Sequence, residues 1–102
     1  MIVVIATLHD KKDAVRIGKG LLEKRLIACY NLWPIESAYW WKGRILDEKE
    51  TFVFMKSQAK HFEAVRAYIK KGSGYEIPEV IALAPKDVDK SFAGWVKSET
   101  GG

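Results

Sequence analysis

The stretch that decides the fold, residues 37–45, reads SAYWWKGRI. The Lys-Gly pair at 42–43 separates two long extended runs, so it predicts the two-residue turn of a β-hairpin. Tyr39, Trp40 and Trp41 come directly before this turn. Because successive side chains of a strand point to opposite faces, large aromatic rings are expected on both faces of the hairpin near its tip.

Outward from the hairpin, the hydrophobic period alternates between values typical of strands and of helices. The predicted elements, in chain order, are a strand at 1–8, a helix at 9–26, extended strands at 27–41 and 44–56, a helix at 58–71, a loop and fourth strand within 72–86, and a short last helix that Asp87 or Asp89 opens. This β-α-β-β-α-β order predicts an α+β fold of the ferredoxin-like kind, an antiparallel sheet with an extra C-terminal helix. The length of 102 residues predicts a single domain spanning 1–102.

Several local signals place the helix ends and contacts. Asp10 is the expected N-cap of the first helix, and Ser57 that of the second. Gly72 is the expected stop of the second helix. Gly18 lies on the apolar stripe of the first helix, so a close approach of helix and sheet is expected there, whereas nothing in the sequence explains Gly20.

The strands are apolar on both faces, as IVVIA, FVFM and VIALA show. Two helices can cover only one face of a four-stranded sheet, so the open face is expected to meet another apolar surface. We therefore predict association with further copies of the chain, with Tyr39, Trp40 and Trp41 at the interface. The alternative is that these rings cover only the local edges of the core.

Composition bounds the compartment and the partners. The net charge is +4, and the longest basic runs are pairs, which argues against a nucleic-acid partner. The single Cys29 excludes an intrachain disulfide and is typical of a reducing compartment. No signal-peptide pattern and no stretch of membrane-spanning length are visible, so a cytoplasmic location and no membrane partner are predicted.

A set of short segments resembles one known family in order and spacing. The segments are ACYN at 28–31, Pro34, Ser37 with YWWKG at 39–43, Glu50, MKS at 55–57, YEIPEVI at 75–81, and Phe92 with Trp95. They resemble the CutA family, the divalent-cation tolerance proteins, over nearly the whole chain. The resemblance implies a homotrimer with its sheets inside and its helices outside. It also implies a role in tolerance of copper and other divalent metals, with no established catalytic activity and no required cofactor.

The chain departs from the family pattern in places that bear on metal binding. The family usually has Pro shortly after an early Thr, whereas Thr7 is followed here by Leu-His-Asp. It usually has His-Pro-Tyr where this chain has Ser73, Gly74 and Tyr75. A serine cannot replace an imidazole as a ligand for a soft metal, so the departure puts a family-wide mode of copper binding in doubt.

Two kinds of metal ligand remain as candidates. Cys29 matches the family's cysteine, and three thiolates around a trimer axis would suit copper(I). The competing interpretation is an unreactive, packed thiol, with divalent ions bound weakly by Asp47, Glu48 and Glu50 at the surface. Neither His9 nor His61 has another His or a Cys at the spacing of a metal site, so we expect both at the surface.

No motif of a known enzyme class is present, so the chain is not expected to be an enzyme. The alternative function is a trimeric sensor for a small molecule or an anion, related in architecture to the PII signalling proteins. Its predicted site is a groove between subunits lined by Lys56, Tyr75 and Glu76. PII proteins carry a long loop between the second and third strands, and the two-residue turn here disfavours signalling of the PII type.

Overall fold

The computed structural model describes residues 1–102, and its elements follow the predicted order. They are β1 (Ile2–Leu8), α1 (Lys11–Glu23), β2 (Cys29–Trp41), β3 (Arg44–Ser57), a 3-10 turn (Ala59–His61), α2 (Phe62–Ser73), β4 (Val80–Leu83) and α3 (Lys90–Glu99). The four strands form one antiparallel sheet in the order β2-β3-β1-β4. The ferredoxin-like α+β prediction is confirmed.

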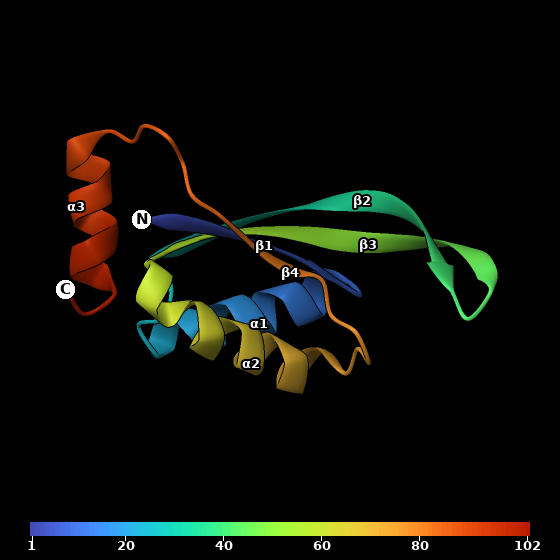
Figure 1. Cartoon of the computed structure of the whole chain (residues 1–102). Helices are drawn as coiled ribbons and strands as arrows, with labels where there is room; N and C mark the ends of the chain where they lie inside the picture. Colours follow the sequence, from blue (N-terminus) through green and yellow to red (C-terminus); the bar gives the residue numbers. More distant parts are fainter.

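The core lies between the sheet and the two long helices. Figure 1 shows α1 and α2 side by side on one face of the sheet. Alternate residues of β1, namely Ile2, Val4, Ala6 and Leu8, point into this layer and are buried against α1 and α2. No helix is both long and apolar enough to cross a membrane.

The β2–β3 hairpin overruns the rest of the sheet. Lys42 and Gly43 form its turn with φ values of 49° and 79°, the left-handed conformation that a two-residue turn of this kind requires. β1 pairs only with Thr51–Ser57 of β3, so the outer half of the hairpin has no third strand beside it. Figure 1 shows this half reaching past β1 and β4, while α3 lies at the other end beside the N-terminus. The long axis of the chain is accordingly 45 Å.

The sheet face opposite the helices carries large apolar side chains. The Trp33 ring packs against the rings of Phe52 and Phe54, with centroids 4.9 and 6.3 Å apart. Ile81 and Leu83 of β4 pair with Ile5 and Val3 of β1 and are exposed on the same face, at the edge of the sheet. Both faces of the strands are thus apolar, and α1 and α2 cover only one of them.

Two glycines of α1 leave space for tyrosine side chains that pack against the helix. A Cβ on Gly18 would lie 2.8 Å from a ring carbon of Tyr30, so the expected close approach of helix and sheet is present. A Cβ on Gly20 would lie 1.9 Å from the Tyr68 hydroxyl, which explains the glycine that the sequence left unexplained. Both glycines therefore make room for tyrosines from other elements.

Some predicted helix ends are confirmed and others are wrong. Asp10 caps α1 by accepting from the Asp13 backbone N–H at 2.8 Å. Ser57 is the last residue of β3 and caps nothing, because its hydroxyl donates to the Leu26 carbonyl at 2.6 Å. Gly72 lies inside α2, which ends instead at Gly74 with φ 75°.

The C-terminal helix begins at one of its two predicted caps and is tied down by a histidine. Asp89, not Asp87, caps α3 and accepts from the Phe92 backbone N–H at 3.0 Å. His61 was expected at the surface, but its Nε2 lies 2.7 Å from the Thr100 carbonyl oxygen. His61 therefore helps to hold the end of α3 against the start of α2.

Candidate functional site

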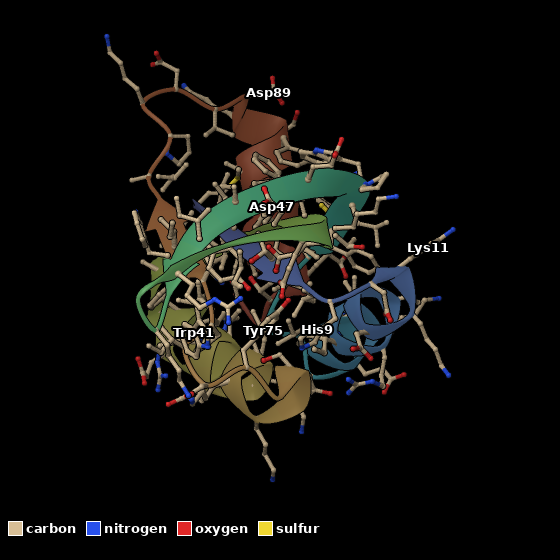
Figure 2. The ribbon with its side chains drawn as sticks, turned by 90° about the vertical axis from the view of Figure 1, so that its right-hand side faces the viewer. His9, Lys11, Trp41, Asp47, Tyr75 and Asp89 are labelled. Carbon is tan, nitrogen blue, oxygen red and sulfur yellow. The ribbon has the colours of Figure 1, made fainter.

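A large hollow lies where the overrunning hairpin meets the loop between α2 and β4. Its volume is about 820 Å³, and it is lined by the outer half of the hairpin, the end of β1 and the loop from Gly74 to Glu79. In Figure 2, Trp41, Tyr75 and His9 lie in a row between the hairpin and the helices. We call this hollow the hairpin pocket.

Nine of the 16 residues that line the hairpin pocket are aromatic or acidic. The aromatic ones are Tyr39, Trp40, Trp41 and Tyr75; the acidic ones are Glu36, Glu48, Glu50, Glu76 and Glu79. His9 is the single histidine in the lining, which contains neither lysine nor arginine. The chain as a whole carries +4, so the pocket has the opposite sign of charge to the rest of the molecule.

Tyr75 connects the elements that form the pocket. Its hydroxyl donates to Glu50 Oε2 of β3 at 2.7 Å. Its ring is stacked on His9, with centroids 3.9 Å apart and an angle of 19° between the planes. Burial, together with the hydrogen bond to Glu50, raises the pKa of Tyr75 well above its usual range. The phenol therefore stays protonated and keeps donating to the carboxylate.

A second phenol–carboxylate pair lies farther out on the hairpin. A hydrogen bond to the Glu48 side chain is the main cause that raises the pKa of Tyr39 to about 12. A negative charge on Tyr39 would also contribute to the raised pKa of Tyr75. Neither tyrosine supplies a negative charge at neutral pH, and Tyr75 donates to Glu50.

The loop that carries Tyr75 is held by α2. The Lys70 ammonium donates to the backbone carbonyls of Tyr75, at 3.3 Å, and of Glu76. The Tyr75 backbone N–H donates to Ser73 Oγ at 3.2 Å. Ser73 is buried and takes part in this loop contact. Its hydroxyl thus positions the ring that forms one wall of the pocket.

The predicted metal ligands come together only in part. Glu48 and Glu50 line the hairpin pocket, whereas Asp47 lines a smaller hollow of about 350 Å³ on the hairpin and not the pocket. Cys29 is half-buried at the start of β2, opposite Lys56 and outside the pocket lining. No group of three or more His, Cys, Asp or Glu side chains is arranged to hold a metal ion. Their roles as ligands stay predictions.

The predicted groove is only partly assembled within one chain. Tyr75 and Glu76 line the hairpin pocket, but Lys56 does not. The Lys56 ammonium instead donates to Asn31 Oδ1 and lies 5.0 Å from the centroid of the Phe54 ring, on the open face of the sheet. Within one chain Lys56 lies six positions along β3 from Glu50, the hydrogen-bond partner of Tyr75, so a groove that Lys56 shares with Tyr75 across a subunit boundary stays a prediction.

Sequence reasoning missed His9, Glu36 and Glu79 as pocket residues. A partial signal existed for His9, because the ferredoxin-like order predicts β1 and β4 as antiparallel neighbours, while the register that sets the partner of His9 comes from the structure. The ladder pairs Ala6 with Val80, and extending it by three residues places His9 opposite residue 77 of the Tyr75 loop. No comparable signal exists for Glu36, which reaches the pocket only through the course of the hairpin.

The fold and the pocket define a class: a ferredoxin-like α+β protein with a long hairpin whose outer half, with the α2–β4 loop, forms an acidic, aromatic-lined pocket. The family model described as "CutA1 divalent ion tolerance protein" matches residues 2–99. The chain belongs to the CutA family.

Relatives and solved structures agree with this assignment. The divalent-cation tolerance protein CutA of Thermotoga maritima is 36% identical over 97 residues, which cover 95% of this chain and 96% of that protein. The CutA protein of Pyrococcus horikoshii is 35% identical and covers 98% of each chain. The structure of the Archaeoglobus fulgidus protein, described as a periplasmic divalent cation tolerance protein, has a TM-score of 0.95 at 33% identity and covers 98% of this chain and 99% of its own.

Proposed function

We propose that this chain is a single-domain subunit of a cytoplasmic homotrimer that acts in divalent-cation tolerance and binds divalent ions weakly through carboxylates. The observation that carries the proposal is the acidic lining of the hairpin pocket, with five glutamates and no lysine or arginine. Carboxylate oxygens are ligands for hard and borderline divalent ions. Because no three donors converge on one point, the binding is expected to be loose and to need no resident cofactor.

The trimer is supported by the apolar surface that the chain leaves uncovered. Besides the apolar open face of the sheet, Trp40 of the outer hairpin is 72% exposed and Ile77 of the α2–β4 loop is 73% exposed. A second and third copy would remove such surface from water, with Tyr39, Trp40 and Trp41 at the contact. Light scattering at micromolar concentration is expected to give about three times the 11.6 kDa chain mass. A stable, soluble monomer would contradict the trimer.

The metal proposal is tested by calorimetry on protein of known mass. Titration with Mn²⁺, Zn²⁺ and Cu²⁺ is expected to show weak binding that falls in Glu48→Gln. Cys29→Ser is expected to leave copper(I) and copper(II) binding unchanged, because Cys29 is proposed as a packed, unreactive thiol. Collapse of copper(I) affinity in Cys29→Ser, with the trimer intact, would instead favour three thiolates around the axis. No metal binding by any of these ions would refute the carboxylate proposal.

The proposed location has its own test. The single thiol is the support for a reducing compartment. Cell fractionation is expected to place the protein with cytoplasmic markers, and recovery with periplasmic markers would refute this part. The chain is proposed to bind rather than to catalyse, since the pocket contains carboxylate–phenol pairs without an activated nucleophile.

A further inference from the structure

We propose that the outer face of α1 and α2 binds an acidic segment of a partner protein, a peptide whose carboxylates are spaced along its chain. We call this surface the basic helical face, and its residues are Lys11, Lys12, Arg16 and Lys19 of α1 and Lys71 of α2. It lies apart from the hairpin pocket, so the proposal is independent of the proposed metal binding. It rests on the segregation of charge, on lysines without a partner in the chain, and on the pattern of acidic residues among them.

Charge is distributed unevenly between the helices and the rest of the chain. Of the 17 Lys and Arg residues, ten lie in the segments 10–25 and 60–73, which contain α1 and α2. Only four of the 13 Asp and Glu residues lie there. The rest of the chain therefore has more acidic than basic residues, although the whole chain carries +4. The helical layer is the positive side of the molecule, and it attracts negatively charged partners.

The basic helical face stays accessible when copies of the chain associate through the open face of the sheet. Figure 1 shows α1 and α2 together on the opposite face. None of the exposed large apolar side chains of the chain belongs to either helix, so this face offers nothing to an apolar contact. In Figure 2, Lys11 lies on the outer side of α1 and points away from the row of Trp41, Tyr75 and His9.

The four lysines of the basic helical face have no partner within the chain. The only lysine side chains that make hydrogen bonds are those of Lys56 and Lys70, and the three ion pairs involve arginines alone. The Arg16 guanidinium donates to the Gly72 carbonyl at 2.9 Å, which holds the start of α1 beside the end of α2. Unpaired ammonium groups from two adjacent helices are therefore held on one surface, where carboxylates of a partner can meet them.

Two of these lysines also lie where the electrostatics of α1 disfavours them. Lys11 and Lys12 are the first two residues of the helix, where the backbone dipole is positive and acidic side chains stabilise. Asp10 caps the helix and Asp13 pairs with Arg16, so the helix N-terminus is already satisfied and is not itself the site. Lysines that break a local rule without compensation in the chain are expected at functional surfaces, where a partner supplies the missing negative charge.

Acidic residues among the lysines select between the classes of negative partner. Asp10 and Glu63 are exposed on the helical layer, and Asp13 is partly exposed. Duplex DNA and anionic membranes carry dense negative charge, which these carboxylates would repel. The two helices also expose no large apolar side chain for bases to stack on or for insertion into a membrane. A peptide with spaced carboxylates can place them on the lysines and avoid the acidic positions, so it fits this face best.

The test is fluorescence anisotropy of a labelled peptide of alternating Glu and Gly, titrated with the native protein at low ionic strength. The peptide is expected to bind, and more weakly as salt is added, whereas the same peptide with Gln in place of Glu is expected not to bind. Lys12→Glu is expected to weaken binding about tenfold or more, because attraction is replaced by repulsion. Lys86→Glu makes the same charge change at an exposed lysine between β4 and α3, and as the matched control it is expected to weaken binding less than about threefold.

A second measurement on Lys12→Glu separates a binding role from a structural one. Glutamate suits the first turn of a helix better than lysine, so the guanidinium midpoint of Lys12→Glu is expected to be higher than that of the parent. Loss of peptide binding in a more stable variant would support the proposal. A lower midpoint would show that Lys12 contributes to the fold, and it would overturn the assignment of Lys12 to a binding face.

The remaining outcomes each overturn the proposal in a different way. No peptide binding at low ionic strength would refute it outright, and equal losses in Lys12→Glu and Lys86→Glu would replace it with diffuse attraction by net charge. Tighter binding of duplex DNA, or of vesicles containing phosphatidylserine, than of the Glu peptide would assign the face to that class of partner instead. Growth in mass beyond the native assembly that Lys12→Glu abolishes would assign it to the acidic hairpin of another copy.

Discussion

Gly18 of α1 offers a sharp test of how closely the helix and the sheet pack. A Cβ at this position would meet three atoms of the Tyr30 ring at 2.8, 2.9 and 3.0 Å. The ring belongs to β2 and packs against the core, so it cannot swing away as the end of a surface side chain could. Gly18→Ala is therefore expected to strain the contact between α1 and β2.

Two opposing effects set the magnitude. Alanine in place of glycine improves helix propensity by about 1 kcal/mol. Overpacking of a filled core costs about 1–3 kcal/mol, and contact with three ring atoms places Gly18→Ala in the upper half of that range. The net result expected is a loss of about 1–2 kcal/mol in the free energy of unfolding.

Gly94 in α3 is the matched control. A Cβ there would have no heavy atom within 4 Å, so Gly94→Ala keeps only the propensity gain of up to about 1 kcal/mol. Equilibrium unfolding in guanidinium chloride, at one fixed protomer concentration, measures both variants against the parent. Tyr30→Leu in the Gly18→Ala background should recover part of the loss by removing the ring. A Gly18→Ala variant as stable as Gly94→Ala would refute the close packing of α1 on β2.

Three further predictions concern single side chains. Lys42→Asn is expected to stabilise the chain by about 0.5–1 kcal/mol in guanidinium unfolding, because Lys42 has φ 49° and Asn tolerates this conformation better. A loss of stability would show that the Lys42 side chain contributes more than its backbone conformation costs. Hydrogen bonds from the Ser91 hydroxyl and a backbone N–H lower the pKa of Asp89, so the stability that Asp89 contributes is present above its unfolded pKa and is lost as the pH falls through the lower, folded value. The difference in unfolding free energy between the parent and Asp89→Ala should therefore close in that acidic range. A difference that persists there would contradict the charged cap. The pKa of Tyr39 is raised to about 12, so the stability that this residue contributes is present below the ordinary pKa near 10 and is lost as the pH rises toward 12. Absorbance titration should show one tyrosine that ionises at unusually high pH, and at lower pH in Glu48→Gln. An unchanged titration in Glu48→Gln would refute the interaction of Tyr39 with Glu48.

Local patterns were sufficient to predict the elements and their order. The turn at Lys42 and Gly43 was predictable because it depends on two adjacent residues and on the runs beside them. The start of α1 was predictable for the same reason, since Asp10 caps it through a contact only three residues away. Ser57 misled the prediction because a serine before a helix is a common cap, and only the tertiary contact with Leu26 assigns it to the sheet.

What the sequence by itself determined is the α+β element order, the hairpin and the surplus of apolar strand faces, because these follow from period, turn chemistry and composition. Only the tertiary structure decided which distant residues meet. Tyr68 above Gly20 depends on how α1 and α2 lie against each other. The contact of His9 and Glu50 with Tyr75 depends on the register of the sheet and the path of the α2–β4 loop. Such contacts join residues far apart in the chain, and no local pattern of period or spacing contains the geometry that brings them together.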